Sequence, residues 1–248
     1  MLLHGFTQTA RLWGPFGDIL AQDHTLIGID LPGHAGSDAV RADLPSTAAL
    51  VAAAVTSTIG AGPCALLGYS LGARVALHVA TGTTLAVSRV VVIGATGGIE
   101  DAEARQARRR ADETTAAALE ASGDLDGFID RWVSGPLFAR LGSAAQAGER
   151  RRNSAVGLAS SLRLAGTGTQ EPLWGRLPAL TIPVLALAGA DDTRFGGHAL
   201  RIARVAPNAV ATLIPGGGHA VHLGQPAPTA RHVHHWLAIN ANPPRSQS

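Results

Sequence analysis

The sequence contains no lysine, so all twenty of its basic residues are arginine. The absence of lysine excludes chemistries that need an amine at a fixed place, namely Schiff-base catalysis, attachment of pyridoxal phosphate and the lysine of a phosphate-binding P-loop. A bias in genomic base composition is sufficient to explain this absence. Arginine nevertheless presents a planar fork to carboxylates that lysine lacks, so the two arginine triplets at 108–110 and 150–152 are candidate anion-binding segments.

Cysteine and long apolar runs are also scarce. The single cysteine, Cys64, has no partner for an intramolecular disulfide. No secretory signal opens the chain, and every apolar run is shorter than the ~20 residues of a membrane helix. We therefore expect a cytoplasmic protein without a membrane span. With 248 residues, 46% of them hydrophobic and 15% charged, and a net charge of +2, the chain is predicted to fold around a large core.

Short apolar runs alternate with alanine-rich amphipathic segments. This pattern is typical of an α/β protein with a mostly parallel central sheet and helices on both faces. Turn residues follow each apolar run, and ligands of such sheets bind beyond the carboxyl ends of the strands. Functional residues are therefore expected directly after the strands, which are predicted at 2–4, 25–29, 64–68, 90–93, 184–188 and 210–214.

The strand pattern is interrupted between residues 99 and 170, where alanine, arginine, glutamate and leucine dominate. We predict that this segment is an inserted helical lid and that residues 1–98 and 171–239 form the core. Residues 240–248, with two adjacent prolines and no apolar periodicity, are predicted to be a disordered tail. Sheets of this kind usually have one or two strands before the first one seen here. Either the coding sequence starts further upstream or an edge hairpin is missing.

The strongest motif is Gly68-Tyr-Ser-Leu-Gly72, which lies between a predicted strand and a helical run. In this context G-x-S-x-G predicts a nucleophile elbow, a sharp turn that lifts the hydroxyl of Ser70 above the sheet. The alternative is a glycine-rich connection in which the serine merely caps the helix.

A serine at its ordinary pKa is a poor nucleophile, so it requires a histidine and an orienting carboxylate. His219 follows the last predicted strand, and Asp191 and Asp192 follow the strand before it. The residues alone do not separate the two aspartates. Of the other histidines, His222 is a candidate for lining the pocket, and those of the terminal segment, His232, His234 and His235, have no spacing that suits a metal site. We predict no metal and no cofactor.

His4-Gly-Phe6 ends the first predicted strand. An oxyanion hole needs two backbone N–H groups, one from the residue after the nucleophile and one from the loop after an early strand. Leu71 and Phe6 are the natural pair for these positions. The alternative interpretation of this segment is a tight turn without a catalytic role.

Several of these motifs together resemble the α/β-hydrolase superfamily along essentially the whole chain. The G-x-x-D spacing in that superfamily favours Asp192 over Asp191. The motifs are His4-Gly-Phe6, Asp30-Leu-Pro-Gly-His34, Gly68-x-Ser-x-Gly72, Gly189-x-x-Asp192 and Gly218-His219.

A narrower resemblance lies in the predicted lid and in the residues that follow the elbow. These segments are similar to the 2-succinyl-6-hydroxy-2,4-cyclohexadiene-1-carboxylate synthases, the menaquinone-pathway members of the superfamily. Lids vary greatly within this fold, so agreement there is more specific than a triad motif. The matching segments are Gly68–Arg74, Gly98-Ile99, Glu103–Asp112, Pro136–Phe138, Arg150-x-x-Asn153, Gly157–Ala159 and Leu162–Gln170. One departure is Ala73, where these enzymes usually have glycine.

This resemblance implies a carbon–oxygen lyase that eliminates pyruvate from a small tricarboxylate. Ser70, His219 and Asp192 would remove a proton beside the succinyl ketone, and the N–H groups of Phe6 and Leu71 would stabilise the enolate. The residues that it places against the substrate are Arg74, Arg108 and Arg150, which bind anions, and Tyr69 and Trp132, which line the pocket. The assignment is open by one helical step, so Arg105, Arg110 and Arg151 remain alternatives. From charge alone a solvated helical face is the simpler explanation of the two triplets, and the three carboxylates of the substrate reverse this preference.

Two other functions use the same residues. A serine hydrolase acting on carboxylesters or carbon–carbon bonds would use this triad through an acyl-enzyme. A catalytically silent binding module of the same fold is the other possibility, and the intact Ser70, His219 and Asp192 set argues against it. Nucleic-acid binding is not expected, because eighteen acidic residues offset the arginines and no basic stripe with interleaved aromatics is present. The sequence does not decide between a monomer and a homodimer.

Overall fold

The computed structural model describes residues 1–139, 141–142 and 147–240, and within them one six-stranded sheet in the order β2-β1-β3-β4-β5-β6. Every neighbouring pair of strands is parallel. The prediction of six strands is confirmed, and their ends differ from the predicted ones by no more than three residues. The strands are β1 (Leu2–Leu3), β2 (Gly28–Ile29), β3 (Cys64–Tyr69), β4 (Val87–Ile93), β5 (Val184–Gly189) and β6 (Ala209–Ile214). Apart from Asn240, the predicted tail lies outside the described residues.

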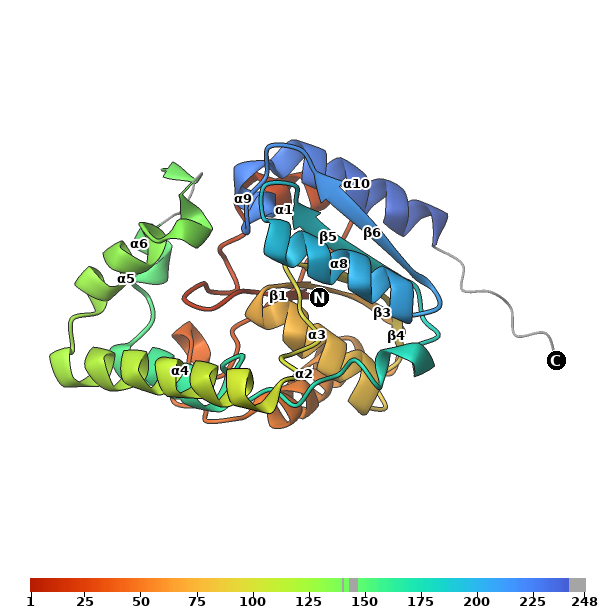
Figure 1. Cartoon of the computed structure of the whole chain (residues 1–248). Helices are drawn as coiled ribbons and strands as arrows, with labels where there is room; N and C mark the ends of the chain where they lie inside the picture. Colours follow the sequence, from red (N-terminus) through yellow and green to blue (C-terminus); the bar gives the residue numbers. More distant parts are fainter. Residues whose placement is uncertain (140, 143–146, 241–248) are drawn as a thin grey trace.

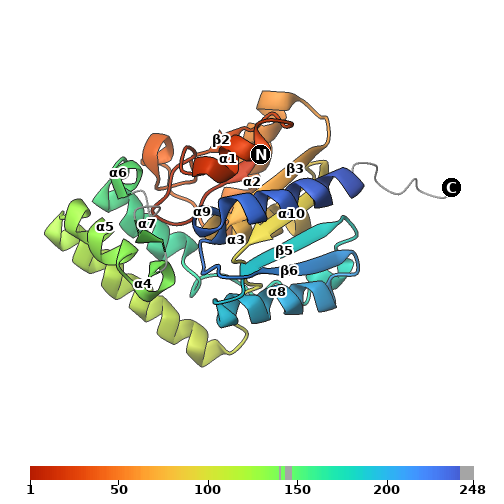
Figure 2. The same cartoon turned by 90° about the horizontal axis from the view of Figure 1, so that it is seen from above.

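Helices cover both faces of the sheet, as the two views in Figures 1 and 2 show. On one face lie α1 (Gly14–Leu20), α9 (Val221–Gly224) and α10 (Pro226–Ile239). On the other lie α2 (Leu44–Ile59), α3 (Leu71–Gly82) and α8 (Thr193–Val205). Short 3-10 turns lie at Ala35–Ser37, Pro136–Phe138 and Leu177–Ala179.

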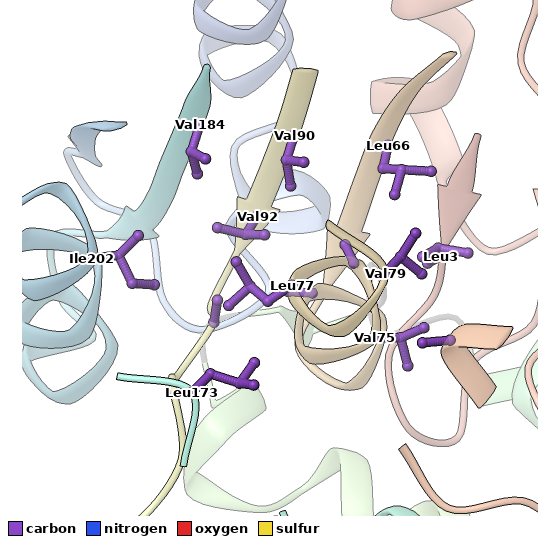
Figure 3. Packing of buried hydrophobic residues seen from close by; sticks show 14 of the residues in the cluster. Leu3, Leu66, Val75, Leu77, Val79, Val90, Val92, Leu173, Val184 and Ile202 are labelled. Atoms are coloured by element: carbon purple, nitrogen blue, oxygen red, sulfur yellow. The ribbon is translucent and has the colours of Figure 1, made fainter. Parts of the chain in front are cut away.

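The core is divided between the two faces because successive side chains of a strand point to opposite sides. On β4, Val90 and Val92 face the α2, α3 and α8 side, whereas Val91 and Ile93 face α1 and α10. Figure 3 shows the first of these layers, in which Leu77 of α3 packs beneath the strands. Strands buried on both faces are continuous apolar runs, which is why they could be predicted from the sequence.

In the described residues, four α-helices are inserted between β4 and β5, and they lie to one side of the sheet in Figure 2. They are α4 (Ala102–Ser122), α5 (Leu125–Val133), α6 (Ala147–Arg150) and α7 (Ala155–Ala165). Side-chain caps start α4, α5 and α7: Asp101, Asp124 and Ser154 each accept a hydrogen bond from a backbone N–H three residues later. The α4 and α7 helices pack against each other, so the insertion has its own small core. Its movement as a lid stays a prediction.

Candidate active site

Ser70 stands at the turn between β3 and α3. Its φ of 50° and ψ of −104° lie outside the regions that non-glycine residues normally occupy, so the backbone is strained here. The Ser70 side chain makes no capping hydrogen bond to α3, which removes the simple capping explanation. This is the geometry expected of a nucleophile elbow.

The two glycines of the motif allow α3 to approach the sheet closely. A Cβ at Gly72 would lie 1.9 Å from the carbonyl oxygen of Leu3, and one at Gly68 would lie 2.3 Å from the carbonyl oxygen of Gly72. Both contacts are with backbone, which has little freedom to move aside. The G-x-S-x-G pattern therefore reflects a steric requirement at both glycines.

The predicted triad residues are in contact. His219 Nε2 lies 3.1 Å from Ser70 Oγ, and His219 Nδ1 lies 2.9 Å from Asp192 Oδ2. An ionised carboxylate only accepts hydrogen bonds, so Nδ1 carries the proton and Nε2 of the neutral ring is free to accept from the serine hydroxyl. The imidazole is buried, and the ring of Phe195 packs against it at 4.2 Å between centroids.

Asp192 rather than Asp191 orients the histidine. Burial by itself would raise the pKa of the Asp192 carboxyl, but hydrogen bonds from His219 and from the Phe195 N–H outweigh burial and lower it. The Phe195 N–H also makes Asp192 the N-cap of α8, which fixes the carboxylate at the end of β5. Asp191 is exposed at the neighbouring position.

Two buried histidines hold the loop after β1. His4 Nε2 accepts a hydrogen bond from the Leu31 N–H, and His34 Nε2 accepts one from the Thr7 N–H. Burial lowers the pKa of both rings, to about 4 for His34, so each is neutral near pH 7. The structural role of His34 was not predicted from the sequence, although its motif was recognised.

The backbone N–H groups of Phe6 and Leu71 differ from neighbouring N–H groups in their hydrogen bonding. In the described part of the chain, the N–H groups of Gly5 and Thr7 have side-chain acceptors, whereas no acceptor is found for those of Phe6 or Leu71. Leu71 begins α3, where N–H groups have no partner within the helix and carry the positive end of its dipole. Both groups therefore remain able to donate to a ligand.

A cavity of about 690 Å³, counted with its open mouth, contains Ser70 and His219. Core and insertion both contribute to its walls. The core gives Phe6, Leu71, Arg74, Gly94, Thr96, Arg194 and Phe195, and the insertion gives Arg108, Trp132, Leu137, Ser161, Leu162 and Ala165–Thr167.

Three of the predicted substrate-binding residues line this cavity. Arg74 is almost completely buried and donates from Nη1 to the Ala165 carbonyl at 2.8 Å. Arg108 comes from α4, with its Nε 2.8 Å from Asp112 Oδ1. Trp132 places its ring 5.0 Å from that of Phe6 in an edge-on contact.

The other three predicted substrate-binding residues do not line it. Arg150 is fully buried, donates to Thr7 Oγ1 at 2.5 Å and lies 5.2 Å from the ring centroid of Phe138. Burial lowers its pKa to about 10, against the attraction of Tyr69. Tyr69 and His222 are also buried and their rings are 4.3 Å apart, on the α1 and α10 side of the sheet.

The alternative arginines lie elsewhere. Arg105 donates to the carbonyls of Ile99 and Glu100, Arg110 is exposed, and Arg151 pairs with Asp126 and Asp130. Of the triplet at 108–110, the one that reaches the cavity is therefore Arg108.

Several lining residues were not predicted, among them Arg194, Phe195, Thr96 and Ser161. Arg194 and Phe195 could have been found from their position directly after Asp192. Thr96 and Ser161 carry no motif that distinguishes them.

The described residues hold neither a cluster of metal ligands nor a helix that could span a membrane. No three His, Cys, Asp or Glu side chains come together there in a way that could hold a metal ion. None of the helices in the same residues is long and apolar enough to cross a membrane.

Comparisons with known proteins place the chain in a family. The model of the alpha/beta hydrolase family matches residues 1–232. The 2-succinyl-6-hydroxy-2,4-cyclohexadiene-1-carboxylate synthase of Escherichia coli O7:K1 is 31% identical over 231 residues, covering 92% of this chain and 88% of that protein. The structure of MenH from S. aureus superposes with a TM-score of 0.89 at 27% identity, over 97% of this chain and 93% of the other.

A third comparison shows how widely the fold is shared. An esterase from Thermogutta terrifontis superposes with a TM-score of 0.83 at 22% identity, over 97% of this chain and 89% of the esterase. Likeness at this level shows the fold alone. The family match over nearly the whole chain and the identity to the synthases go further: this chain belongs to the alpha/beta hydrolase family and, within it, is similar to the 2-succinyl-6-hydroxy-2,4-cyclohexadiene-1-carboxylate synthases.

Proposed function

We propose that the protein is a carbon–oxygen lyase that eliminates pyruvate from 2-succinyl-5-enolpyruvyl-6-hydroxy-3-cyclohexene-1-carboxylate to give 2-succinyl-6-hydroxy-2,4-cyclohexadiene-1-carboxylate in menaquinone biosynthesis. The observation that carries the proposal is the hydrogen-bonded Ser70–His219–Asp192 set in a cavity that also contains the guanidinium groups of Arg74 and Arg108. Similarity to the synthases names the reaction.

The proposed chemistry begins with loss of the ring proton beside the succinyl ketone. Ser70, hydrogen-bonded to His219, takes up this proton and passes its own to the imidazole, while Asp192 stabilises the imidazolium. The electron pair of the broken C–H bond forms an enolate, which accepts hydrogen bonds from the Phe6 and Leu71 N–H groups. One such donor contributes about 2.7–4 kcal/mol in acyl-transfer enzymes.

The enolate then collapses. Its electron pair forms a carbon–carbon double bond in the ring, the existing double bond shifts, and the carbon–oxygen bond to the enolpyruvyl group breaks. The leaving group takes up a proton and becomes pyruvate. The substrate and the two products together have the same oxidation level. The elimination therefore balances without an external oxidant or reductant.

The inserted helices have a proposed part in this reaction. Residues 99–170 would act as a lid, because they supply Arg108 and Trp132 to a cavity whose other wall holds Ser70. Closing such a site excludes water and strengthens the electrostatic contacts within it. We further propose that the enzyme works in the cytoplasm on a small dissolved anion, as a monomer or a homodimer.

A serine hydrolase of carboxylesters or carbon–carbon bonds is the second candidate. The same serine, histidine and pair of N–H groups could form and break an acyl-enzyme, and the fold is shared with an esterase. Burst kinetics with an activated ester and trapping by a serine-directed phosphonate would support this candidate.

A coupled assay of pyruvate release tests the proposal on the wild type and on Ser70→Ala, Arg108→Ala and Arg109→Ala. Arg109 is exposed and outside the cavity, so it serves as the matched control for its neighbour. We expect release by the wild type and by Arg109→Ala, a loss of about 10³-fold or more in Ser70→Ala, and a marked rise in KM in Arg108→Ala. No release by folded wild-type protein would refute the lyase. Loss with Ser70→Ala but not with Arg108→Ala would favour a generic hydrolase-like site over a site in which Arg108 binds the tricarboxylate.

A further inference from the structure

Arg194 lies in the wall of the cavity, among the lining residues that come from the core. It is the second residue of α8, two positions after Asp192. Because Asp192 caps α8 and contacts His219, the backbone that carries Arg194 is fixed relative to the triad. The place of this side chain at the cavity therefore follows from the same elements that place the triad.

The Arg194 guanidinium lies 5.6 Å from the centroid of the Phe195 ring, and that ring packs against His219. Within the described residues, no carboxylate lies within ion-pair distance of Arg194, and its guanidinium makes no hydrogen bond there. The planar face of the group is thus supported by an aromatic ring while its N–H donors stay available.

Other arginines near the cavity are partly compensated. Asp112 pairs with Arg108, and the Ala165 carbonyl accepts a hydrogen bond from Arg74. Arg201, seven residues further along α8 than Arg194, is paired with Glu100. Arg194 is exposed and makes no ion pair or hydrogen bond with a described residue; the Asp192 carboxylate attracts it only from a greater distance, as its effect on the pKa of Asp192 shows. Its N–H donors therefore remain available to a bound anion.

Among the described residues, three arginines line the cavity, and they come from three different elements: Arg74 from α3, Arg108 from α4 and Arg194 from α8. The substrate of the proposed reaction carries three carboxylates. A planar guanidinium fork matches the geometry of a carboxylate, so three such forks around one cavity suit a tricarboxylate.

We propose that Arg194 binds a substrate carboxylate and determines specificity for polycarboxylates over neutral or singly charged molecules. This inference rests on the proposed function, which supplies a substrate with three carboxylates. The choice of Arg194 rests on its position in the cavity wall and on its lack of an ion pair among the described residues. Arg194 touches substrate in this view and takes no part in proton transfer.

The test measures binding without turnover. Propane-1,2,3-tricarboxylate and its neutral trimethyl ester are titrated calorimetrically into the full-length Ser70→Ala protein, alone and combined with Arg194→Gln, Arg194→Lys or Arg204→Gln. Arg204 is exposed near the end of the same helix and outside the cavity, so it controls for the loss of one positive charge on α8. Thermal unfolding of each variant verifies that it is folded.

We expect Arg194→Gln to weaken binding of the trianion about tenfold, because charge-assisted hydrogen bonds are among the stronger polar contacts. Arg194→Lys should recover part of this loss, since it restores the charge without the fork. Arg204→Gln should change affinity for the trianion by less than about twofold, and no variant should change affinity for the ester. With the serine intact, Arg194→Gln should raise KM for the substrate and change kcat little.

Unchanged affinity for the trianion in Arg194→Gln would overturn the inference, as would an equal loss in Arg204→Gln or an equal loss for the neutral ester. Failure of the proposed lyase reaction is a separate result, because it appears as the absence of pyruvate release by the wild type. If the wild type released no pyruvate but Arg194→Gln weakened binding of the trianion, the carboxylate site at Arg194 would be supported and the lyase reaction would be refuted.

Discussion

Asp112 Oδ1 lies 2.8 Å from Arg108 Nε, so a buried acid and an arginine that reaches the cavity are paired across one turn of α4. The same carboxylate acts on Arg74 of α3. Burial, and then repulsion by Arg108, lower the pKa of Arg74 to about 10, and the attraction of Asp112 opposes both effects. One carboxylate of the insertion thus offsets two guanidinium groups, one from the insertion and one from the core.

Replacement of this carboxylate is expected to be costly. In Asp112→Asn, the guanidinium groups of Arg74 and Arg108 would lose the carboxylate that attracts both. Asp112 is buried but the Arg108 side chain is partly exposed, so we expect the free energy of unfolding to fall by about 2 kcal/mol, less than the roughly 3–5 kcal/mol of a fully buried pair. Chemical denaturation measures this change. Glu113→Gln, at the next position on α4 and in an exposed pair with Arg163, is the control and should have little effect. Equal stability of Asp112→Asn and the wild type would show that Asp112 does not balance the arginines.

The two adjacent aspartates after β5 should differ sharply in activity. Asp192→Asn removes the charge that stabilises the imidazolium of His219, and we expect kcat for pyruvate release to fall by about 10³-fold or more. Asparagine can still cap α8, so thermal unfolding should change little. Asp191→Asn, one residue earlier and exposed, should retain nearly full activity. A comparable loss in Asp191→Asn would mean that the orienting carboxylate has been wrongly identified.

The sheet and the contact between Ser70, His219 and Asp192 could be anticipated because their signals are local. Each strand of a parallel sheet buried on both faces is an apolar run, and each of these residues directly follows such a run. Parallel strands bring their carboxyl ends to one edge, so residues far apart in the sequence meet there. Only the choice between Asp191 and Asp192 required the spacing of related proteins.

The arginines could not be assigned in the same way. Arg150 and Arg108 each lie in a basic triplet, yet Arg108 reaches the cavity and Arg150 is buried against Thr7 and Phe138. Which of them reaches the cavity depends on how helices of the insertion pack, and this is a property of long-range contacts rather than of spacing. Arg194 was missed because no anion-binding motif marks it, although its place after Asp192 sets it at the cavity.

Two fully buried histidines make the stability of the protein sensitive to mild acid. Burial lowers the pKa of His34 to about 4, against hydrogen bonds that raise it, and burial together with Arg150 and His219 lowers the pKa of His222 to about 3. An unfolded histidine has a pKa of about 6.5. Between these values the unfolded chain binds protons that the folded protein does not, so the free energy of unfolding decreases as the pH falls below about 6.5.

Replacing His222 by phenylalanine should make this pH dependence shallower. Each such histidine contributes at most about 1.4 kcal/mol per pH unit, which is about 2 kcal/mol between pH 6.5 and pH 5. Neither ring nitrogen of His222 has a hydrogen-bond partner among the described residues, and Trp13, Phe16 and Tyr69 surround it, so phenylalanine should fit without breaking a hydrogen bond. Denaturant unfolding at pH 7, 6 and 5 measures the slope, with His232→Phe on the exposed side of α10 as control. If His222→Phe lost as much stability between pH 7 and pH 5 as the wild type, protonation of His222 would not contribute to acid unfolding, and the other buried histidines would have to account for it.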